Sequence, residues 1–359
     1  MSLDTPLTVL LQIIHGCNIS CQFCYVGTDR NHLHPRIPPL ARTIEIIDLI
    51  EQAGVQEVVL LGGEPTMHPH LATICRDMAS RSFVARGIVT NGTVLDPRIT
   101  SVLKDSGFWV DVSIRGPDSA TYRELTNSSD AFERSMAGLR LLAASNIAVG
   151  VEYDCTTANY NRLYDSVRNI YDLGVSIRQV QLHRFIPAGD AAVNLDIRPE
   201  LSHYLEVFAQ MSRIRNELGI PAIFEDGFPL CLVERSFWEL IAPCGCGYSL
   251  LAIGLDGEFK HCICSEYTLG NISTTPIREI WNGPLLGEYR SASRYHPQCR
   301  GCDLLDICRG GCRSSACVAG LAAHDFFADK FQAQKLADRD ALDTKLVFAQ
   351  SIRVSRPGC

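Results

Sequence analysis

The chain has 359 residues, of which 46% are hydrophobic, and a formal net charge of -7. This length and apolar content allow roughly two domains with sizeable cores. The acidic balance comes without a basic stripe, which argues against a nucleic-acid partner. The first residues lack a secretion signal and no apolar run reaches the roughly 18 residues of a membrane span, so we expect a soluble, cytoplasmic protein with no membrane partner.

Short β-branched runs alternate with amphipathic helical stretches up to about residue 185. Helices are predicted between the strands, for instance over 41–53 and over 161–173, where Gly174 ends the helix. Such β/α units in series predict an α/β fold with a parallel sheet and right-handed crossovers. The predicted strands cover residues 8–14, 57–61, 85–89, 109–114, 148–153 and 178–184.

The rest of the chain divides by composition. After a first domain over 1–185, residues 186–242 are predicted to bridge to a second domain and to contain a helix over 200–218. From Cys244 the sequence becomes rich in Cys and Gly, which predicts a small domain over 243–320 and then a helical tail over 321–359. Sixteen cysteines in a long chain without a secretion signal indicate metal binding rather than disulfides.

Cys17, Cys21 and Cys24 follow the first predicted strand in a C-x3-C-x2-C pattern. Three thiolates on one tight loop can hold three irons of a cubane cluster and leave the fourth iron open. Structural zinc instead favours paired C-x2-C knuckles with four ligands, so the spacing favours the cluster. Gly62-Gly63-Glu64-Pro65 follows the second predicted strand. Its glycines let a ligand approach the backbone, and its glutamate offers a carboxylate to an ammonium group.

These two loops together resemble the radical S-adenosylmethionine (radical SAM) superfamily. The resemblance implies a partial (β/α)6 TIM-like barrel whose chemistry lies at the carboxyl ends of the strands. It implies that the three cysteines bind a [4Fe-4S] cluster and that SAM chelates the open iron. It also implies a set of SAM-binding residues: Phe23 near the adenine, Gly62, Gly63 and Glu64 on the methionyl ammonium, and Asn91, Ser113 and Glu152 at later strand ends.

Other polar residues stand near the predicted strand ends. Arg115 occupies a position where relatives often carry Asp. It and Asp154, His183 and Arg184 are expected either to position SAM or substrate or to be structural polar residues at strand termini. His15 and Tyr25, which flank the cysteine loop, are expected to pack and orient it.

Nine further cysteines fall between residues 244 and 317 and resemble the SPASM extension of radical SAM enzymes, with a β-hairpin near 254–260. The resemblance implies two auxiliary [4Fe-4S] clusters, although a zinc ribbon is an alternative. Either Cys246 or Cys264 is expected to complete the first cluster, and the other to be a spectator or a hydrogen donor. The resemblance implies Cys244, Cys262 and Cys312 as ligands of the first cluster and Cys299, Cys302 and Cys308 as ligands of the second. We take Cys246 and Cys317 as the candidates for the two remaining positions.

Cys317 is assigned to the second cluster because this chain lacks the last cysteine that the family pattern predicts. Relatives usually place their last cysteine in a later turn, whereas residues 324–328 of this chain contain none. If Cys317 is not a ligand, the second cluster keeps an open iron for a substrate, His324 or Asp325. The remaining cysteines (Cys75, Cys155, Cys231 and Cys359) are expected to be buried apolar residues or tail residues.

The resemblance implies an oxidoreductase-like enzyme with SAM and three [4Fe-4S] clusters as cofactors. It would cleave SAM reductively to a 5′-deoxyadenosyl radical, take hydrogen from an unactivated C–H bond of a natural-product intermediate, and pass an electron to the auxiliary clusters. An electron donor such as flavodoxin or ferredoxin is implied. An electron-transfer or iron–sulfur storage protein is disfavoured, because neither would need the Gly-Gly-Glu-Pro loop.

Three substrate classes compete. The substrate is expected to be a small polar metabolite, such as a sugar, nucleoside or amino acid, or a peptide. One alternative is a ribosomal-peptide maturase that forms a cross-link or thioether. A strand that begins at Thr8 leaves no room before it for a leader-binding domain, which lowers this alternative without excluding it. The other alternative is sulfur insertion from an incompletely ligated auxiliary cluster.

Overall fold

A single curved sheet organises the protein, which a computed structural model describes over residues 3–27, 35–316 and 324–330. Its ten strands lie in the order β10-β9-β8-β1-β2-β3-β4-β5-β6-β7. Strands β1 to β7 and β8 are joined by parallel pairing, and β9 and β10 are antiparallel additions at one end. The strands are β1 (Thr8–Ile14), β2 (Glu57–Gly62), β3 (Ala85–Thr90), β4 (Trp109–Ile114), β5 (Val149–Asp154), β6 (Ile177–His183), β7 (Ala222–Phe224), β8 (Leu250–Ile253), β9 (Glu258–Lys260) and β10 (Gly270–Asn271).

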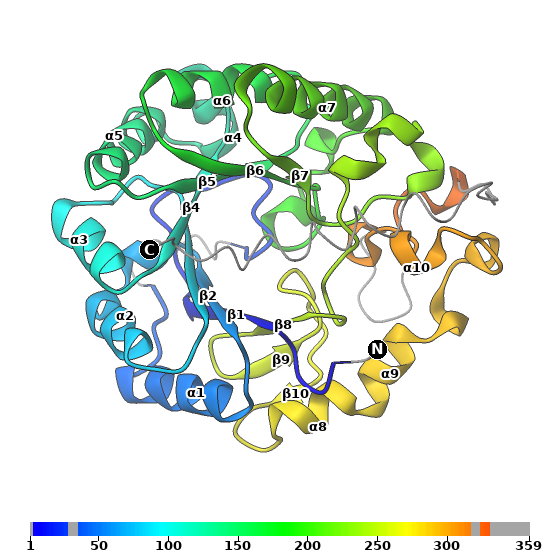
Figure 1. The fold of residues 1–359 in the computed structure, drawn as a ribbon, viewed down its shortest axis with the longest axis horizontal. Helices are drawn as coiled ribbons and strands as arrows, with labels where there is room; N and C mark the ends of the chain where they lie inside the picture. The colour runs from blue at the N-terminus through cyan, green and yellow to red at the C-terminus, as the bar shows by residue number, and fades with distance from the viewer. Residues whose placement is uncertain (1–2, 28–34, 317–323, 331–359) are drawn as a thin grey trace.

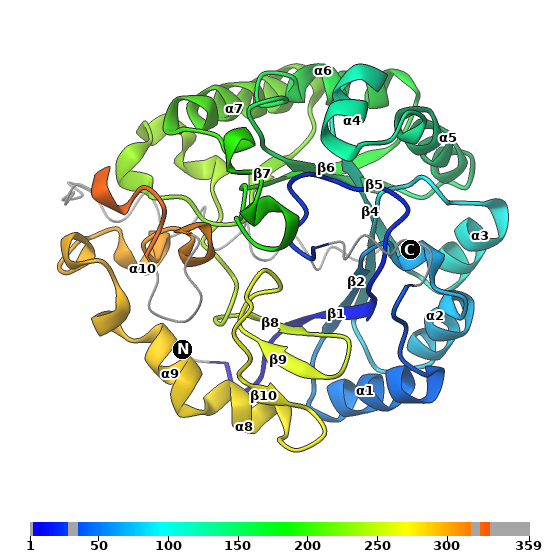
Figure 2. The ribbon, with the colours of Figure 1, turned by 180° about the vertical axis from the view of Figure 1, so that it is seen from behind.

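Helices cover the outer face of this sheet, as Figures 1 and 2 show. Helix α1 buries Thr43, Ile46, Ile47 and Ile50, a spacing that puts one apolar stripe against the strands. Asp96 and Asp118 cap α3 and α4 by accepting backbone hydrogen bonds from Ile99 and Thr121. The helices are α1 (Leu40–Gln52), α2 (Leu71–Ala79), α3 (Pro97–Asp105), α4 (Ser119–Thr126), α5 (Ala131–Ala144), α6 (Leu163–Asp172), α7 (Leu201–Arg213), α8 (Ile277–Asn282), α9 (Pro284–Arg290) and α10 (Leu305–Cys308).

The predicted α/β barrel is confirmed, and each of the six predicted strands agrees with the structure to within one residue at either end. The sheet also continues beyond them. β7 comes from the segment predicted to bridge the domains, and β8, in the Cys-rich region, pairs directly with β1. The helix predicted over 200–218 ends as an α-helix at Arg213 and continues as one π-helical turn over Ile214–Leu218. The Cys-rich region is thus built onto the edge of the barrel.

The hairpin predicted near 254–260 is present with a small offset. Its strands are β8 and β9, and the turn between them contains Gly257 at a φ of +89°. A positive φ of this size is a conformation that glycine adopts without steric cost. Of the helical tail predicted over 321–359, residues 324–330 are described and form a short 3-10 helix over Ala328–Lys330. Residues 331–359 lie outside the described ranges.

An aromatic cluster joins α7 and β7 to residues 324–330. The rings of Tyr204, Phe228 and Phe327 lie 5.3 to 6.0 Å apart, centroid to centroid. Arg184 packs over these rings and pairs with Asp325, and both side chains are almost completely buried. Asp325 also accepts backbone hydrogen bonds from Cys312 and Phe327. This ion pair fastens residues 324–330 to the end of β6.

None of the helices within the described ranges is both long enough and apolar enough to cross a membrane.

Replacing Asp325 by Ala should destabilise the protein strongly. The change leaves the Arg184 guanidinium buried without its carboxylate, which typically costs about 3–5 kcal/mol. Asp172→Ala is the matched control, because it removes an ion pair with Arg168 in which both side chains are about half exposed, and such pairs contribute less than about 1 kcal/mol. The melting temperatures of the two variants give the comparison. A loss in Asp325→Ala no larger than in the control would contradict this role.

Candidate active site

One cavity of about 1160 Å³ runs along the inside of the barrel and is lined by residues at both the amino and the carboxyl ends of the strands. Ligand-binding cavities commonly occupy several hundred cubic ångströms, so this one can hold a cofactor and a substrate together. The loops after β1 and β2 form part of its wall, and cysteines of the C-terminal region form another part. Its lining includes Cys17, Cys21, Phe23, Cys24, Gly62, Gly63, Glu64, Asn91, Ser113, Arg115, Glu152, Asp154, His183, Cys244, Cys246, Cys262 and Cys264.

The loop that carries Cys17, Cys21 and Cys24 is held by backbone hydrogen bonds on several sides. His15 and Arg36 form an isolated antiparallel bridge at its start. The amides of Ser20 and Gln22 donate to the last turn of α4, and the carbonyl of Cys24 accepts from the turn at residues 190–191. Cys17 and Cys21 are 8% and 7% exposed. Backbone contacts from several elements therefore fix the position of the three cysteines.

The Gly-Gly-Glu loop after β2 lies directly against the start of the cysteine loop. The amide of Gly63 donates to the carbonyl of Ile14 and that of Glu64 to the carbonyl of Gly16, each at 2.9 Å. A Cβ atom on Gly63 would lie 2.0 Å from the Gly16 oxygen, and one on Gly62 would lie 2.5 Å from the Ile14 oxygen. Neither glycine can therefore carry a side chain without moving the backbone of the cysteine loop.

Glu64 is buried at the end of this loop and is surrounded by donors. Its Oε1 accepts from the Thr66 amide, the Thr66 hydroxyl and the Thr90 hydroxyl, and its Oε2 accepts from the Asn91 amide at 2.7 Å. Burial raises the pKa of Glu64, while these hydrogen bonds lower it. Four donors orient the carboxylate and leave Oε2 with room for a further partner.

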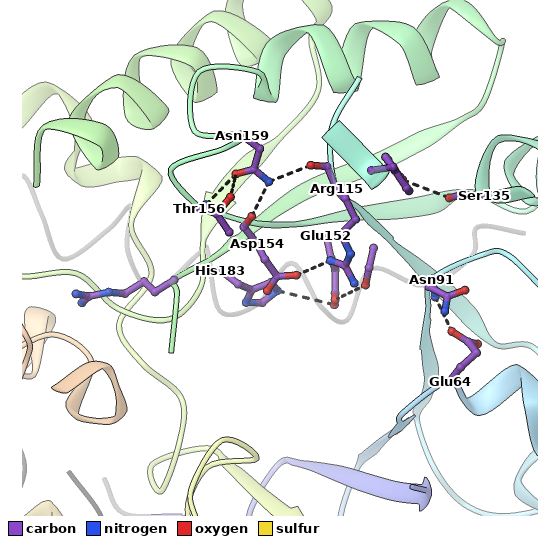
Figure 3. Close-up of polar contacts among 12 residues, drawn as sticks. Glu64, Asn91, Arg115, Ser135, Glu152, Asp154, Thr156, Asn159 and His183 are labelled. Atoms are coloured by element: carbon purple, nitrogen blue, oxygen red, sulfur yellow. Dashed lines mark hydrogen bonds and ion pairs between the residues drawn. The ribbon is translucent and has the colours of Figure 1, made fainter. Parts of the chain in front are cut away.

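Asn91 connects Glu64 to the cysteine loop. Its side-chain Nδ2 lies 3.5 Å from the Sγ of Cys17 and 3.1 Å from the Oδ1 of Asn18. Its backbone amide is the group that donates to Glu64, as Figure 3 shows. Asn91, at the end of β3, thus connects Cys17 with Glu64, which follows β2.

Arg115, at the end of β4, brings a positive charge to the cysteine loop. Its guanidinium lies over the ring of Phe23, 4.9 Å from the centroid, and pairs with Asp154 at 2.5 Å (Figure 3). Burial raises the pKa of Cys21, and the nearby charge of Arg115 lowers it. This chain therefore places a buried cation beside a cysteine of the loop.

Beside this cation, on the neighbouring strands, is a group of side chains that can share a proton. Glu152 lies 3.9 Å from His183 (Figure 3) and 3.4 Å from Ser113, and His183 lies 3.4 Å from Asp226. Burial raises the pKa of Glu152 to about 8. Burial lowers the pKa of His183, but the hydrogen bond with Asp226 and the charges of Asp226, Glu152 and Asp154 together outweigh burial and hold that pKa well above its usual value. The cavity wall here can bind a polar or cationic group.

Five cysteines of the C-terminal region form what we call the first thiol group: Cys244, Cys246, Cys262, Cys264 and Cys312. Cys246 is within hydrogen-bonding reach of Cys244 and Cys262, and Cys262 is also in reach of Cys264. Hydrogen bonds from Cys246 and Cys264 lower the pKa of Cys262. A [4Fe-4S] cluster takes four thiolates, so this group has the required number and one more.

The first thiol group comes close to the cysteine loop through Tyr25. Tyr25 and Cys264 pack against the small apolar cluster of Ile186, Ala188 and Cys312. The predicted packing role of Tyr25 is consistent with this contact, and Tyr25 lies near both Cys264 of the first thiol group and Cys24 of the loop.

A second thiol group, made of Cys299, Cys302 and Cys308, lies at the other end of the C-terminal region. These cysteines line a small second cavity beside α10. The Sγ of Cys308 is 3.8 Å from the carbonyl oxygen of Phe228. The group therefore adjoins the segment that follows β7.

The described thiols do not form the site of a single metal ion. Within residues 3–27, 35–316 and 324–330, no three His, Cys, Asp or Glu side chains converge as the ligands of one ion do. In a cubane cluster each thiolate binds a different iron. Burial raises the pKa of Cys17 and Cys21 and brings that of Cys24 to about 12, so cluster binding must release protons from the loop.

Comparison with known proteins agrees with this geometry. Residues 11–172 match the model of the radical SAM superfamily, and residues 244–303 match the iron–sulfur cluster-binding SPASM domain. The chain is a radical SAM enzyme with a C-terminal SPASM domain. SAM and iron–sulfur clusters are the cofactors that these two domains imply.

Curated relatives resemble the radical SAM/SPASM chain over most of its length. The AdoMet-dependent heme synthase of Methanosarcina barkeri is 24% identical, with 88% of this chain and 93% of the relative covered. The PqqA peptide cyclase of Ruegeria pomeroyi is 24% identical, with 88% and 84% covered. The mycofactocin maturase MftC of Mycobacterium tuberculosis is 25% identical, with 89% and 81% covered.

A solved structure supports the same fold. Streptococcus suis SuiB bound to S-adenosylmethionine matches with a TM-score of 0.73 and 18% identity, over 92% of this chain and 78% of SuiB. The SuiB structure bound to the precursor peptide SuiA matches with a TM-score of 0.75. At this identity the likeness concerns the fold alone.

The structure brings most of the predicted site residues together. The three cysteines of the loop, the six remaining barrel residues (Gly62, Gly63, Glu64, Asn91, Ser113 and Glu152) and Phe23 all line the main cavity. Arg184 also touches the cavity, but its guanidinium is committed to Asp325. Cys317 lies outside the described residues. The sequence did not predict Thr66 and Thr90, whose hydroxyls donate hydrogen bonds to Glu64. Neither threonine belongs to a recognisable motif.

Replacing Arg115 by Gln should make the reduction potential of the loop-bound cluster more negative. The change removes a buried positive charge beside Cys21, and such a charge favours the more negative, reduced cluster. An EPR-monitored redox titration, following the signal that responds to SAM, measures the shift. Arg178→Gln is the matched control, because Arg178 pairs with Asp111 and stacks on Trp109 at the amino end of β6. A positive shift, or equal shifts in both variants, would refute the role of Arg115.

Proposed function

We propose that this enzyme removes hydrogen from an unactivated C–H bond of a polar natural-product intermediate, and that auxiliary clusters assist a net oxidation. The observation that carries the proposal is that one cavity joins the cysteine loop, the Glu64 loop and four cysteines of the first thiol group. A SAM molecule bound at the loop cluster would supply, when cleaved reductively, a 5′-deoxyadenosyl radical, which no side chain can provide.

The residues around the loop would hold SAM in place. Cys17, Cys21 and Cys24 would hold the cluster, and Glu64, oriented by its four donors, would accept the methionyl ammonium on Oε2. Because the Arg115 guanidinium covers one face of the Phe23 ring, the adenine would meet the other face or the edge. Asn91, Ser113 and Glu152 are proposed as further polar contacts to SAM.

The C-terminal cysteines would hold two auxiliary clusters, giving three [4Fe-4S] clusters in all. The first thiol group faces the cavity and Tyr25, so it is placed to take an electron from the substrate. Cys246 contacts two other thiols of the group and Cys264 one, which supports Cys246 as the ligand and leaves Cys264 facing Tyr25. A flavodoxin or ferredoxin would supply the electron that starts the reaction.

The substrate class follows from the polar wall of the cavity. Glu152, Glu225 and Asp226 line it together with His183, so a hydroxylated or cationic substrate would find partners there. A small polar metabolite or a peptide with such side chains satisfies this requirement.

A second candidate is maturation of a peptide. It is favoured by the relatives, because one of them is named a peptide cyclase and SuiB is seen with its precursor peptide SuiA. The two candidates use the same site and differ in the substrate that is turned over.

The variant Cys17→Ala/Cys21→Ala/Cys24→Ala should form no 5′-deoxyadenosine. Removal of the three thiolates leaves no ligands for the SAM-binding cluster, while both thiol groups of the C-terminal region remain. Reconstituted wild-type protein should contain about 12 iron atoms and the variant about 8, because each cubane holds four. Anaerobic assays with dithionite and SAM, together with iron and sulfide analysis, measure both quantities.

Two results would count against the proposal. Unchanged SAM cleavage in the variant would show that the cluster is elsewhere. Wild-type iron near four atoms per chain, with stoichiometric zinc, would show a zinc domain in place of auxiliary clusters. Cys75→Ala serves as the control for loss of a thiol, since Cys75 is buried in α2 and does not line the main cavity.

A further inference from the structure

Cys231 lies with the second thiol group, although it is 68 residues before Cys299 in the sequence. It is in the short 3-10 helix Leu230–Leu232, which follows β7. The small cavity beside α10 is lined by Cys231 together with Cys299, Cys302 and Cys308. Its other lining residues are Pro229, Gln298, Leu304, Leu305 and Gly310. Four thiols from two distant segments therefore surround one space that is otherwise largely apolar.

Independent contacts hold these two segments together. The Sγ of Cys308 approaches the carbonyl oxygen of Phe228, three residues before Cys231, at 3.8 Å. Gly311 packs so closely on Pro229 that an added Cβ would lie 2.9 Å from the proline ring. The segment that leads into Cys231 is thus held against residues 308–311 by two contacts.

His324 and Asp325 lie in the stretch where the family resemblance predicts a last cysteine, and neither is placed to bind the second cluster in its stead. Asp325 is buried in its pair with Arg184 and accepts further hydrogen bonds from Cys312 and Phe327. His324 packs its ring edge-on against His296, with centroids 5.1 Å apart. Neither residue lines the small cavity. A side chain that completes the second thiol group must come from another segment.

We propose that Cys231 is the fourth ligand of the second auxiliary cluster. Each of the four thiols would lose its proton and form one S–Fe bond to a different iron, which closes a [4Fe-4S] cluster. The proposal rests on the proposed function, which makes the second thiol group a cluster site. A cluster closed in this way offers no iron to a substrate and no easily released sulfide. Its role would be electron transfer, which favours oxidation over sulfur insertion.

The test compares Cys231→Ala with Cys317→Ala in the full-length, anaerobically reconstituted protein. Cys231→Ala should lose about four iron atoms per chain or change the EPR signal of one auxiliary cluster, whereas Cys317→Ala should match the wild type in both. Cys231→Ser should recover iron while its signal stays altered, because an oxygen ligand can replace the sulfur. The SAM-responsive EPR signal should persist in all three variants, which shows that the barrel is folded.

The opposite pattern would overturn the proposal. If Cys231→Ala keeps the wild-type iron content and spectrum, Cys231 is not a ligand, whether or not Cys317→Ala changes. Loss of the SAM-responsive signal together with the auxiliary iron in both Cys231 variants would indicate a packing role instead. This failure is distinct from failure of the proposed function, in which the wild-type protein itself would lack the auxiliary iron.

Discussion

The close contact between two loops determines the rest of this active site. Gly63 lies so near Gly16 that a side chain would overlap the Gly16 carbonyl, and the hydrogen bonds from Gly63 and Glu64 lock the loops together. Because β1 and β2 are parallel neighbours, their carboxyl ends meet at one edge of the sheet. The contact between the two loops also fixes the distance between Cys17 and the buried carboxylate of Glu64.

The charges of the barrel are arranged around this contact. A carboxylate held by four donors stands on one side of the cysteine loop, and the Arg115 cation stands on the other. The same cavity then reaches the first thiol group past Tyr25, so SAM, substrate and an electron acceptor can all lie within it. Pairing of β8 with β1 makes this possible, since it attaches the Cys-rich region to the strand that carries the cysteine loop.

The features that sequence could predict are local ones. Apolar runs bounded by polar residues located the six strands, and the spacing of Cys17, Cys21 and Cys24 located the loop. The environment of Glu64 depends on Thr90 from another strand, and the pairing of Arg184 with Asp325 joins residues 141 positions apart. Cys231 was predicted to be an apolar residue because its neighbours in sequence contain no motif. These contacts are set by packing between elements, which no spacing rule encodes.

Contacts between distant segments hold the C-terminal region and the cysteine loop in place. Asp325 fastens residues 324–330 to the barrel through its pair with Arg184. Cys231, in the segment after β7, lines the same small cavity as the second thiol group. Arg115 pairs with Asp154 beside the cysteine loop.

The proposed function requires SAM to bind at the cysteine loop, next to Glu64. Electron–nuclear double resonance on the reduced protein, with SAM carrying ¹⁵N in its amino group, tests this binding most directly. We expect a strong hyperfine coupling between that nitrogen and a single cluster, and we expect the coupling to disappear in the Cys17→Ala/Cys21→Ala/Cys24→Ala variant. Absence of the coupling in wild-type protein saturated with SAM, or its persistence in the variant, would show that SAM does not bind there.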